Sequence, residues 1–332
     1  MEPIFESGIQ IILFLQGIGD WLTFPMTIFT FLGDEEFYLL VMPALYWCLD
    51  TRLGFNIGLI LMLSGSINNI LKMAFHSPRP FWISTEVQVF REEISFGTPS
   101  GHAQNAVVVW GTLAASIHRR WIWAIAVALI LSIGVSRMVL AIHFPLDVLI
   151  GWLVGMIVLW AFLTYRQSVT TWLSNQSASV KVFIALTISL LLILLGVISL
   201  ITLGDWSIPE NWIQTALINI PNSDPIEPLS LSGLITTAGA LFGLATGYII
   251  VSDRMGFDPG GVWWKRLLRY LIGVVGVIGI WAGLDALFPE GQTLLAYSLR
   301  YVRYCLVGVW VTGIAPELFM RLNLAKSKRA LN

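Results

Sequence analysis

Hydrophobic residues fill long, uninterrupted stretches of this chain, and polar residues collect in short segments between them. An α-helix needs about 20 apolar residues to cross a bilayer, and these stretches lack the strict alternation of membrane β-barrel strands. The pattern predicts an all-α, polytopic membrane bundle with about nine transmembrane helices. They are expected at residues 35–50, which is short for a span, 55–75, 102–118, 121–142, 147–165, 181–203, 230–251, 268–288 and 294–318.

Two further segments define the expected organisation. The stretch 8–32 is interrupted by Asp20 and Pro25, so it is interpreted as an interfacial helix, with a further membrane crossing as the alternative. A polar segment with prolines and acids follows residue 203. The expected parts are therefore a core at 1–203 that carries the chemistry, an extracytoplasmic loop at 204–229, and C-terminal transmembrane helices of unknown role at 230–332.

Composition supports the membrane class. Hydrophobic residues make up 56% of the 332 residues and charged residues 12%, against roughly a quarter charged in soluble domains. Cys48 and Cys305 lie far apart in apolar segments, which predicts neither a disulfide framework nor a metal site. The net charge of −1 does not indicate a nucleic-acid partner, and none is expected.

The distribution of charge predicts the orientation. With nine spans, thirteen of the 19 Lys and Arg residues fall on one side, and the opposite loops are mainly acidic. The positive-inside rule makes the basic side cytoplasmic, together with the C-terminus, and a bacterial-type inner membrane is favoured. Arg300 and Arg303 have no motif around them, so they are interpreted as partners of Asp285 or as interfacial residues.

Three segments place costly polar groups at the outer membrane face: "LKMAFHSPRPFW", "TPSGH" and "SRMVLAIHFPLD". They bring together three cations, Lys72, Arg79 and Arg137, which resemble a phosphate cage more than a set of ion pairs because few carboxylates are available. Ser100 is expected to cap the helix that follows, and Gly101 to allow close backbone approach. The free N–H groups of that helix start would then face the same anion.

The same segments contain two histidines with different expected roles. His143 and Asp147 are four residues apart at a helix start marked by Pro145, so the carboxylate can orient the imidazole as a nucleophile. His102 comes from another span and is free to protonate a leaving oxygen. Taken singly, each residue is equally well interpreted as a structural hydrogen bonder or an interfacial anchor. The spacings taken together favour a site.

Those spacings resemble the type-2 phosphatidic acid phosphatase superfamily, which includes lipid phosphate phosphatases, glucose-6-phosphatases and vanadium haloperoxidases. The matching signature is Lys72 with six residues to Arg79-Pro80, then Pro99-Ser100-Gly101-His102, then Ser136-Arg137 with five residues to His143 and three more to Asp147. It covers about residues 55–165. "RPFW" and "SRMVLAIHFP" are similar to the glucose-6-phosphatase branch, but Asp147 stands where that branch lacks the acid.

The resemblance implies a six-helix phosphatase core and roles for the residues above. Lys72, Arg79 and Arg137 would bind the phosphoryl group with Ser100 and Gly101. His143 would form a phosphohistidine, Asp147 would hold its imidazole, and His102 would act as acid and then base. The family works without a metal, so neither a cofactor nor a metal is expected. Independently of the resemblance, Phe81 and Trp82 are predicted to line the access route for the substrate, with aromatic residues of the membrane interface as the alternative, and His76 is undecided.

The resulting prediction is an integral membrane phosphatase with its site on the extracytoplasmic side. Its expected partners are membrane lipids and a phosphorylated substrate. A lipid phosphate or polyprenyl diphosphate is favoured because a site near the interface suits an amphiphile that enters from the lipid. The alternatives are a sugar phosphatase similar to glucose-6-phosphatase, a lipid phosphotransferase, and a non-catalytic transporter that uses the cations as an anion site.

Overall fold

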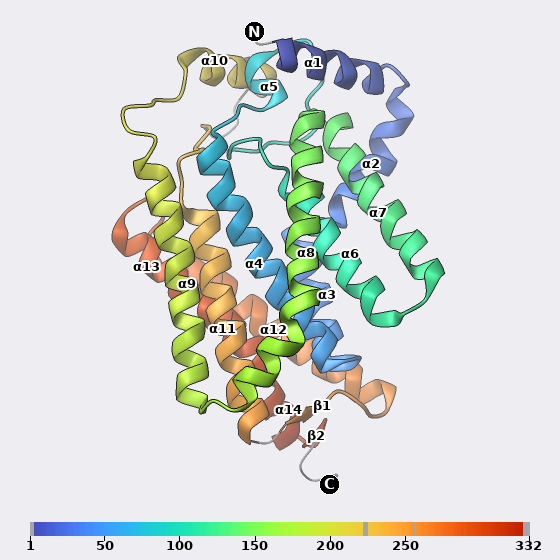
Figure 1. Cartoon of the computed structure of the whole chain (residues 1–332), viewed down its shortest axis with the longest axis vertical. Helices are drawn as coiled ribbons and strands as arrows, with labels where there is room; N and C mark the ends of the chain where they lie inside the picture. The colour runs from blue at the N-terminus through green and yellow to red at the C-terminus, as the bar shows by residue number, and fades with distance from the viewer. Residues whose placement is uncertain (1–2, 222–224, 255, 328–332) are drawn as a thin grey trace. The chain divides into compact units, whose positions relative to one another are not determined.

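The computed structural model describes residues 3–221, 225–254 and 256–327, and almost all of the regular structure is helical (Figure 1). Three of the predicted segments, 1–203, 204–229 and 230–332, extend beyond the described residues, at positions 1–2, 222–224, 255 and 328–332. The helices are α1 (Pro3–Gln16), η1 (Asp20–Leu22), α2 (Thr23–Phe31), α3 (Glu35–Cys48), α4 (Thr51–Phe75), α5 (Pro80–Ile83), α6 (Gly101–Ile117), α7 (Arg120–Val139), α8 (Pro145–Ser174), α9 (Ala178–Ile201), α10 (Glu210–Asn219), α11 (Ser232–Arg254), α12 (Trp263–Asp285), α13 (Leu294–Val309), η2 (Trp310–Ile314) and α14 (Ala315–Arg321). One short antiparallel pair joins β1 (Phe257–Asp258) to β2 (Lys326–Ser327).

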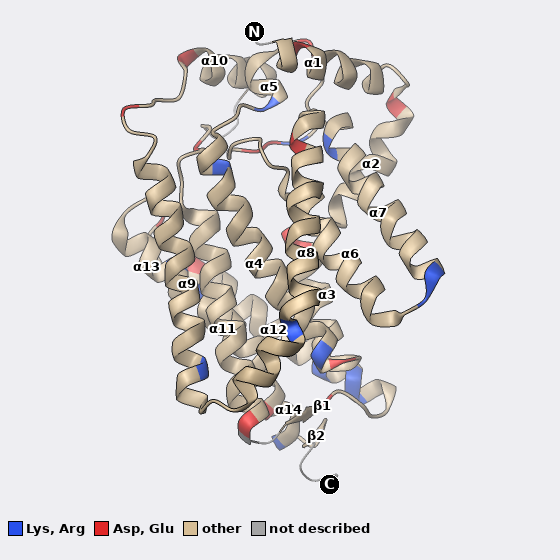
Figure 2. Ribbon diagram, viewed as in Figure 1, with Lys and Arg blue, Asp and Glu red and all other residues tan. Residues whose placement is uncertain are grey.

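The predicted all-α membrane fold is confirmed. Within the described residues, seven helices are long and apolar enough to cross a membrane, or eight if one bent pair is a single span. Each of the nine predicted segments contains a helix, but α3 has 14 residues and α6 has 17, which is short for a crossing. The exact number of nine spans therefore stays a prediction. Figure 2 shows the charged residues mostly at helix ends and in connections, with long uncharged stretches between them.

The N-terminal stretch forms the bent pair. The helix Pro3–Gln16 and the helical segment Asp20–Phe31 meet at an angle of 92°, which is the geometry of a broken span or a re-entrant loop. The turn contains Gly19 at φ +136°, a conformation that residues with a Cβ rarely adopt. The sequence left open an interfacial helix or a crossing, and the structure has a sharp bend near the interruption at Asp20.

The chain divides into two compact units that do not follow the order of the sequence. The first unit comprises Met1–Phe37, Ile67–Trp160 and Gly196–Ser230, and the second comprises Tyr38–Ser66, Ala161–Leu195 and Leu231–Asn332. Helices α3, α4, α8 and α9 contribute residues to both. The predicted boundaries at residues 203 and 229 divide the sequence into consecutive segments, and they stay a prediction.

In the first unit, two glycines of α8 allow α6 to approach closely. A Cβ on Gly151 would lie 2.6 Å from the carbonyl oxygen of Ser100, and a Cβ on Gly155 would lie 2.7 Å from that of Gln104. Real Cβ atoms essentially never come so near to backbone, so larger residues here would push α6 away. This packing brings the start of α6 against the start of α8.

The second unit has its own core around α3, α11, α12 and α13. The indole of Trp47 donates to the carbonyl of Val311 at 2.7 Å, and the Tyr46 hydroxyl donates to the carbonyl of Thr312 at 3.2 Å. The rings of Phe55 and Tyr248 stack with centroids 3.8 Å apart. Arg303 forms an ion pair with Asp285, one of the partnerships expected from the sequence. Arg300 instead donates to the Thr236 hydroxyl at 3.4 Å.

Candidate active site

The three sequence motifs meet inside the first unit, where backbone hydrogen bonds join them. The N–H of Ser100 donates to the carbonyl of Asp147 at 2.9 Å, and the N–H of Gly97 donates to the carbonyl of Ser77 at 2.9 Å. A Cβ on Gly97 would lie 2.6 Å from the carbonyl oxygen of Pro78, so a larger residue would separate these loops. Residues 47 and 20 positions apart in the sequence are thus held side by side.

His143 lies in the connection between α7 and α8 and is 1% exposed. Its Nδ1 is 3.4 Å from Asp147 Oδ2, and its Nε2 is 3.3 Å from Arg79 Nη1. Nδ1–H therefore faces the carboxylate, and the lone pair of Nε2 faces the guanidinium donor. Burial, followed by the charges of Arg79, Arg137 and Lys72, lowers the pKa of His143 well below its usual value. The imidazole is consequently neutral, as a nucleophile must be.

Asp147 is held as tightly as the histidine it faces. It is buried, it accepts a hydrogen bond from the Thr98 hydroxyl, and its Oδ2 accepts the N–H of Phe144 at 2.8 Å. Pro145 opens α8 and removes a donor at the first turn, where the carboxylate already satisfies a neighbouring N–H. The sequence analysis did not identify Thr98, although it directly precedes the Pro-Ser-Gly-His motif.

The Arg79 side chain is fully buried, and its guanidinium donates to several backbone carbonyls. Its Nε donates to the carbonyl of Ser95 at 2.6 Å, and Nη1 donates to that of Ile142 at 2.8 Å. Lys72 reaches the same loop, with its Nζ 2.8 Å from the Ser95 hydroxyl. Lys72 and Arg79, two of the three predicted cations, therefore both contact Ser95.

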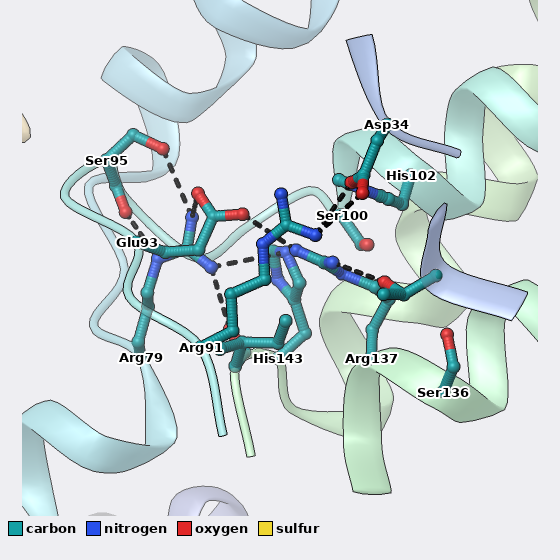
Figure 3. Close-up of polar contacts among 12 residues, drawn as sticks. Asp34, Arg79, Arg91, Glu93, Ser95, Ser100, His102, Ser136, Arg137 and His143 are labelled. Carbon is teal, nitrogen blue, oxygen red and sulfur yellow. Dashed lines mark hydrogen bonds and ion pairs between the residues drawn. The ribbon is translucent and has the colours of Figure 1, made fainter. Parts of the chain in front are cut away.

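Glu93, which the sequence analysis placed only among the acids of an outer loop, lies between the cations. Its Oε1 is 2.8 Å from Arg137 Nη2 and its Oε2 is 3.5 Å from Arg79 Nη2 (Figure 3). Burial alone would raise the pKa of Glu93, but Arg79, Arg137 and Lys72 outweigh it and hold the pKa far below its usual value. The structure thus pairs Arg79 and Arg137 with an ionised carboxylate, which corrects the expectation that few carboxylates are available for ion pairs with these cations. In the sequence, the one feature that could have pointed to Glu93 is its position seven residues before Ser100.

The start of α6 supplies the predicted backbone donors. Ser100 is buried and caps the helix, with its side chain accepting from the N–H of Ala103 at 3.5 Å. Asn68 of α4 stabilises this turn, because its Nδ2 donates to the carbonyl of Pro99 at 3.2 Å and to Gln104 Oε1 at 2.9 Å. A Cβ on Gly101 would lie 3.1 Å from Asn68 Oδ1, so a larger residue here would require the Asn68 side chain to shift by a few tenths of an ångström.

His102 follows in the first turn of α6, and its partner comes from the N-terminal segment. Nε2 of His102 is 2.7 Å from Asp34 Oδ1, and Arg91 Nη1 donates to both oxygens of Asp34 at 2.8 and 2.9 Å. The sequence analysis identified neither Asp34 nor Arg91 as part of the site. The 68 positions between Asp34 and His102 leave no local pattern that could reveal the contact.

The residues predicted to line the access route lie in an aromatic cluster. Phe81 and Trp82 are both buried, and Trp82 contacts Phe96 and Trp212 with ring centroids 6.5 and 6.0 Å apart. His76 is half-buried, with its ring 5.4 Å from that of Trp206. Helix α10 therefore covers α5 from within the predicted 204–229 loop. An access role for these residues stays a prediction and would require the cluster to part.

The described residues contain no group of three or more His, Cys, Asp or Glu side chains arranged to hold a metal ion. The site combines four cations, two histidines and three carboxylates, and Asp147 faces His143 while Asp34 faces His102. Such a set can bind an oxyanion, provide a neutral nucleophile and move a proton. The fold and site therefore define a helical membrane protein with a buried centre of cations, carboxylates and histidines.

The family matches identify this class of protein. The sequence pattern described as "PAP2 superfamily" matches residues 53–171, and that described as "PAP2 superfamily phosphatase, transmembrane extension" matches residues 235–327. The chain belongs to the PAP2 superfamily and is a membrane phosphatase of that family. The first match contains all the predicted site residues, and the second lies in the C-terminal helices.

Individual relatives agree with the family. Glucose-6-phosphatase 2 of Mus musculus is 25% identical over 99% of this chain and 100% of that protein. Phosphatidylglycerophosphatase B of Bacillus subtilis (strain 168) is 29% identical over 41% of this chain and 71% of that protein. The crystal structure of a transmembrane PAP2 type phosphatidylglycerolphosphate phosphatase from Bacillus subtilis is 24% identical, covers 51% of this chain and 88% of that chain, and has a TM-score of 0.43.

Proposed function

We propose that this membrane phosphatase hydrolyses a phosphoric ester without a metal ion, through a phosphohistidine at His143. The observation that carries the proposal is the placement of the His143 ring. Nδ1 is directed at Asp147 and Nε2 at Arg79 Nη1, which is 3.3 Å away. A buried, neutral imidazole whose free lone pair faces a phosphate-binding cation is arranged to attack phosphorus.

The phosphoryl group would bind where Glu93 now lies. Arg79 and Arg137 each direct one Nη2 at that carboxylate, and Lys72 adds a third positive charge nearby. A phosphate dianion carries more charge and more acceptor oxygens than a carboxylate, so it competes for the same donors. The N–H groups at the start of α6, where Ser100 and Gly101 lie, supply further donors.

The reaction has two steps. His143 Nε2 forms a bond to phosphorus as the ester P–O bond breaks, and His102 donates a proton to the leaving oxygen. A water molecule then gives a proton to His102 and attacks phosphorus, which breaks the P–N bond and releases inorganic phosphate. The three cations stabilise the charge on the equatorial oxygens in both transition states, because charge develops there as bonds form and break.

The direct test is His143→Ala in the purified full-length protein. Substitution removes the attacking atom, so both phosphate release and an acid-labile phosphoenzyme are expected to disappear. The matched control is His118→Asn, which replaces an exposed histidine at the end of α6 and tolerates its φ of +55°. Turnover that survives in His143→Ala would show that another group is the nucleophile.

Two substrate classes are candidates. A lipid phosphate is supported by the expected position of the site near the membrane interface. A sugar phosphate is supported by the relatives, because the glucose-6-phosphatase of Mus musculus matches along 99% of this chain. The probable sphingosine-1-phosphate phosphatase of Dictyostelium discoideum matches along 46% of this chain. Phosphate release from phosphatidate, a polyprenyl diphosphate, a sphingoid phosphate and glucose 6-phosphate, measured side by side, decides between the two classes.

The same panel tests the alternatives to hydrolysis. A phosphotransferase would release little phosphate until an acceptor lipid is added, whereas a hydrolase needs only water. A transporter that binds anions would show neither phosphate release nor a phosphoenzyme. Vanadate is expected to inhibit the hydrolase, because its trigonal-bipyramidal form mimics the transition state.

We also propose that the site faces the extracytoplasmic side, because most Lys and Arg residues are expected on the other side. A cysteine at exposed Gln88, in a chain with Cys48 and Cys305 replaced, should react with an impermeant maleimide in intact cells. A cysteine at exposed Arg119 is the matched control and should react only after the cells are opened.

A further inference from the structure

We propose that Asp34 is a positioning residue that holds His102 for both of its proton transfers, with Arg91 fixing the Asp34 carboxylate. This inference rests on the proposed function and goes beyond it, since nothing in the three sequence motifs points to residues 33–34. It gives the N-terminal bent pair a part in the reaction.

The contacts around His102 come from two directions. Asp34, in the connection between α2 and α3, places Oδ1 2.7 Å from His102 Nε2. The neighbouring Gly33 lies beside the carbon atoms of the ring, since a Cβ there would be 2.8 Å from His102 Cδ2 and 3.3 Å from Cγ. One short segment therefore orients the ring by a hydrogen bond at its edge and by contact with its carbon atoms.

Arg91 completes the arrangement from the loop before α6. Its Nη1 donates to both oxygens of Asp34, at 2.8 and 2.9 Å, while the Asp34 side chain is 8% exposed (Figure 3). Burial alone would raise the pKa of Asp34, but hydrogen bonds from His102 and Arg91 outweigh it and hold the pKa below its usual value. The carboxylate is therefore ionised and cannot rotate freely away from the histidine.

The chemistry that follows is that of a carboxylate–histidine pair. Nε2–H donates to Asp34, which leaves Nδ1 as the atom that exchanges a proton with the substrate side. In the first step, Nδ1 gives its proton to the leaving oxygen, and the carboxylate stabilises the imidazolium that existed before transfer. In the second step, Nδ1 takes a proton from water, and the carboxylate stabilises the imidazolium that forms. Asp34 itself keeps its charge throughout.

The pairing of a carboxylate with one ring nitrogen of a histidine occurs twice in the site. Asp147 faces Nδ1 of His143, while Asp34 faces Nε2 of His102. The nucleophile therefore keeps Nε2 free and the acid–base residue keeps Nδ1 free. The partner of the nucleophile is four residues away in sequence, and the partner of the acid–base residue is 68 residues away.

The test is Asp34→Asn, which keeps the shape and removes the charge, assayed on two substrates. The first is the best alkyl phosphate from the substrate panel, whose leaving group needs a proton, and the second is p-nitrophenyl phosphate, whose leaving group does not. A positioned acid contributes about 10²- to 10⁴-fold, so we expect kcat/KM for the alkyl phosphate to fall about 10²-fold, with a much smaller loss for p-nitrophenyl phosphate. Equal losses on both substrates would contradict the proposal.

The second readout is the phosphoenzyme itself. With p-nitrophenyl phosphate, Asp34→Asn should still form phosphohistidine but hydrolyse it slowly, so the acid-labile phosphoenzyme should accumulate. A general loss of structure would instead reduce it. Asp20→Asn is the matched control, because it removes an exposed carboxylate from the same N-terminal segment and should behave like the parent chain.

A double-mutant cycle ties the effect to His102. If Asp34 acts through that histidine, Asp34→Asn added to His102→Ala should change kcat/KM by less than about twofold, whereas independent effects would multiply. Gly33→Ala disturbs the other contact of the His102 ring. If Asp34→Asn fails to fold, Gly33→Ala should show the same larger loss on the alkyl phosphate than on p-nitrophenyl phosphate. If His143→Ala abolishes the phosphoenzyme while Asp34→Asn behaves like Asp20→Asn, only this inference is wrong. If His143→Ala retains turnover, the proposed function is wrong.

Discussion

Each compact unit contains a fully buried arginine, and the two arginines have different partners. In the second unit, Arg269 donates to the carbonyls of Pro259 and Gly260 at 2.8 and 2.9 Å. In the first unit, Arg137 donates to the Thr30 hydroxyl at 2.6 Å and to Glu93 at 2.8 Å. Burial is the same for both, but one guanidinium closes a backbone turn while the other faces side chains.

The difference in partners separates structure from binding. Backbone carbonyls are fixed and neutral, so a ligand can displace Arg269 from them only by unfolding the turn. Glu93 lies in a loop and its carboxylate is held mainly by charge, so under the proposed function a phosphate displaces it. A buried cation therefore indicates a binding site only when its partner is exchangeable.

Glycines show the same contrast. In the first unit, Gly151 of α8 faces the Ser100 carbonyl, and in the second unit Gly239 of α11 faces the Tyr301 carbonyl, with Cβ distances of 2.6 and 2.7 Å. Both allow close helix contact, which is how helices pack in a membrane. Only the first contact sets the distance between Pro-Ser-Gly-His and Asp147.

The largest expected effect separates the two arginines. Arg137→Lys keeps the charge but loses the planar fork, so we expect kcat/KM to fall about 10²- to 10³-fold with little change in Tm. Arg269→Lys is the matched variant and should lower Tm while leaving kcat/KM close to the parent value. Phosphate release and thermal unfolding in the same detergent check both. Equal activity loss in the two variants would remove the distinction.

The next effect separates the two glycines. Gly151→Ala and Gly239→Ala should each destabilise the chain by about 1–3 kcal/mol, because the added methyl group must displace backbone. Only Gly151→Ala should also lower kcat, by about tenfold, since a 1 Å misplacement of catalytic groups is costly. Unfolding curves and kcat measured below each Tm test this. A comparable fall in kcat for Gly239→Ala would contradict it.

A smaller effect concerns the exchangeable partner. Glu93→Gln removes the charge that competes with phosphate, so we expect vanadate to inhibit at about tenfold lower concentration, a difference of about 1.4 kcal/mol. Glu92→Gln, at the exposed neighbouring position, is the control and should leave inhibition unchanged. Weaker vanadate inhibition in Glu93→Gln would mean that Glu93 supports the cations rather than competing for them.

The smallest expected effect is that of chelation. Because the cations of the first unit take the place of a metal in the proposed mechanism, incubation with EDTA should leave the rate of phosphate release unchanged. Adding Mg²⁺ back after dialysis is the control and should have no effect either. A rate that falls on chelation and returns with metal would overturn the metal-free mechanism.

The sequence by itself determined the helices and the groups that carry the chemistry. Apolar length sets the membrane class, Pro-Ser-Gly marks the start of α6, and the four-residue spacing places Asp147 next to His143. These inferences succeed because their causes are local: they depend on residues within one or two helical turns. The pairing of Arg303 with Asp285 was accessible for a related reason, since unpaired charge is costly in a membrane.

Only the tertiary structure decided which carboxylates complete the site. Asp34 reaches His102 across 68 positions, and Glu93 reaches Arg137 across 44, through loops that have no periodicity. The first contact joins the connection between α2 and α3 to α6, and the second joins the loop before α6 to α7. Contacts of this kind depend on how separate helices pack, so the printed sequence contains their residues but not their proximity.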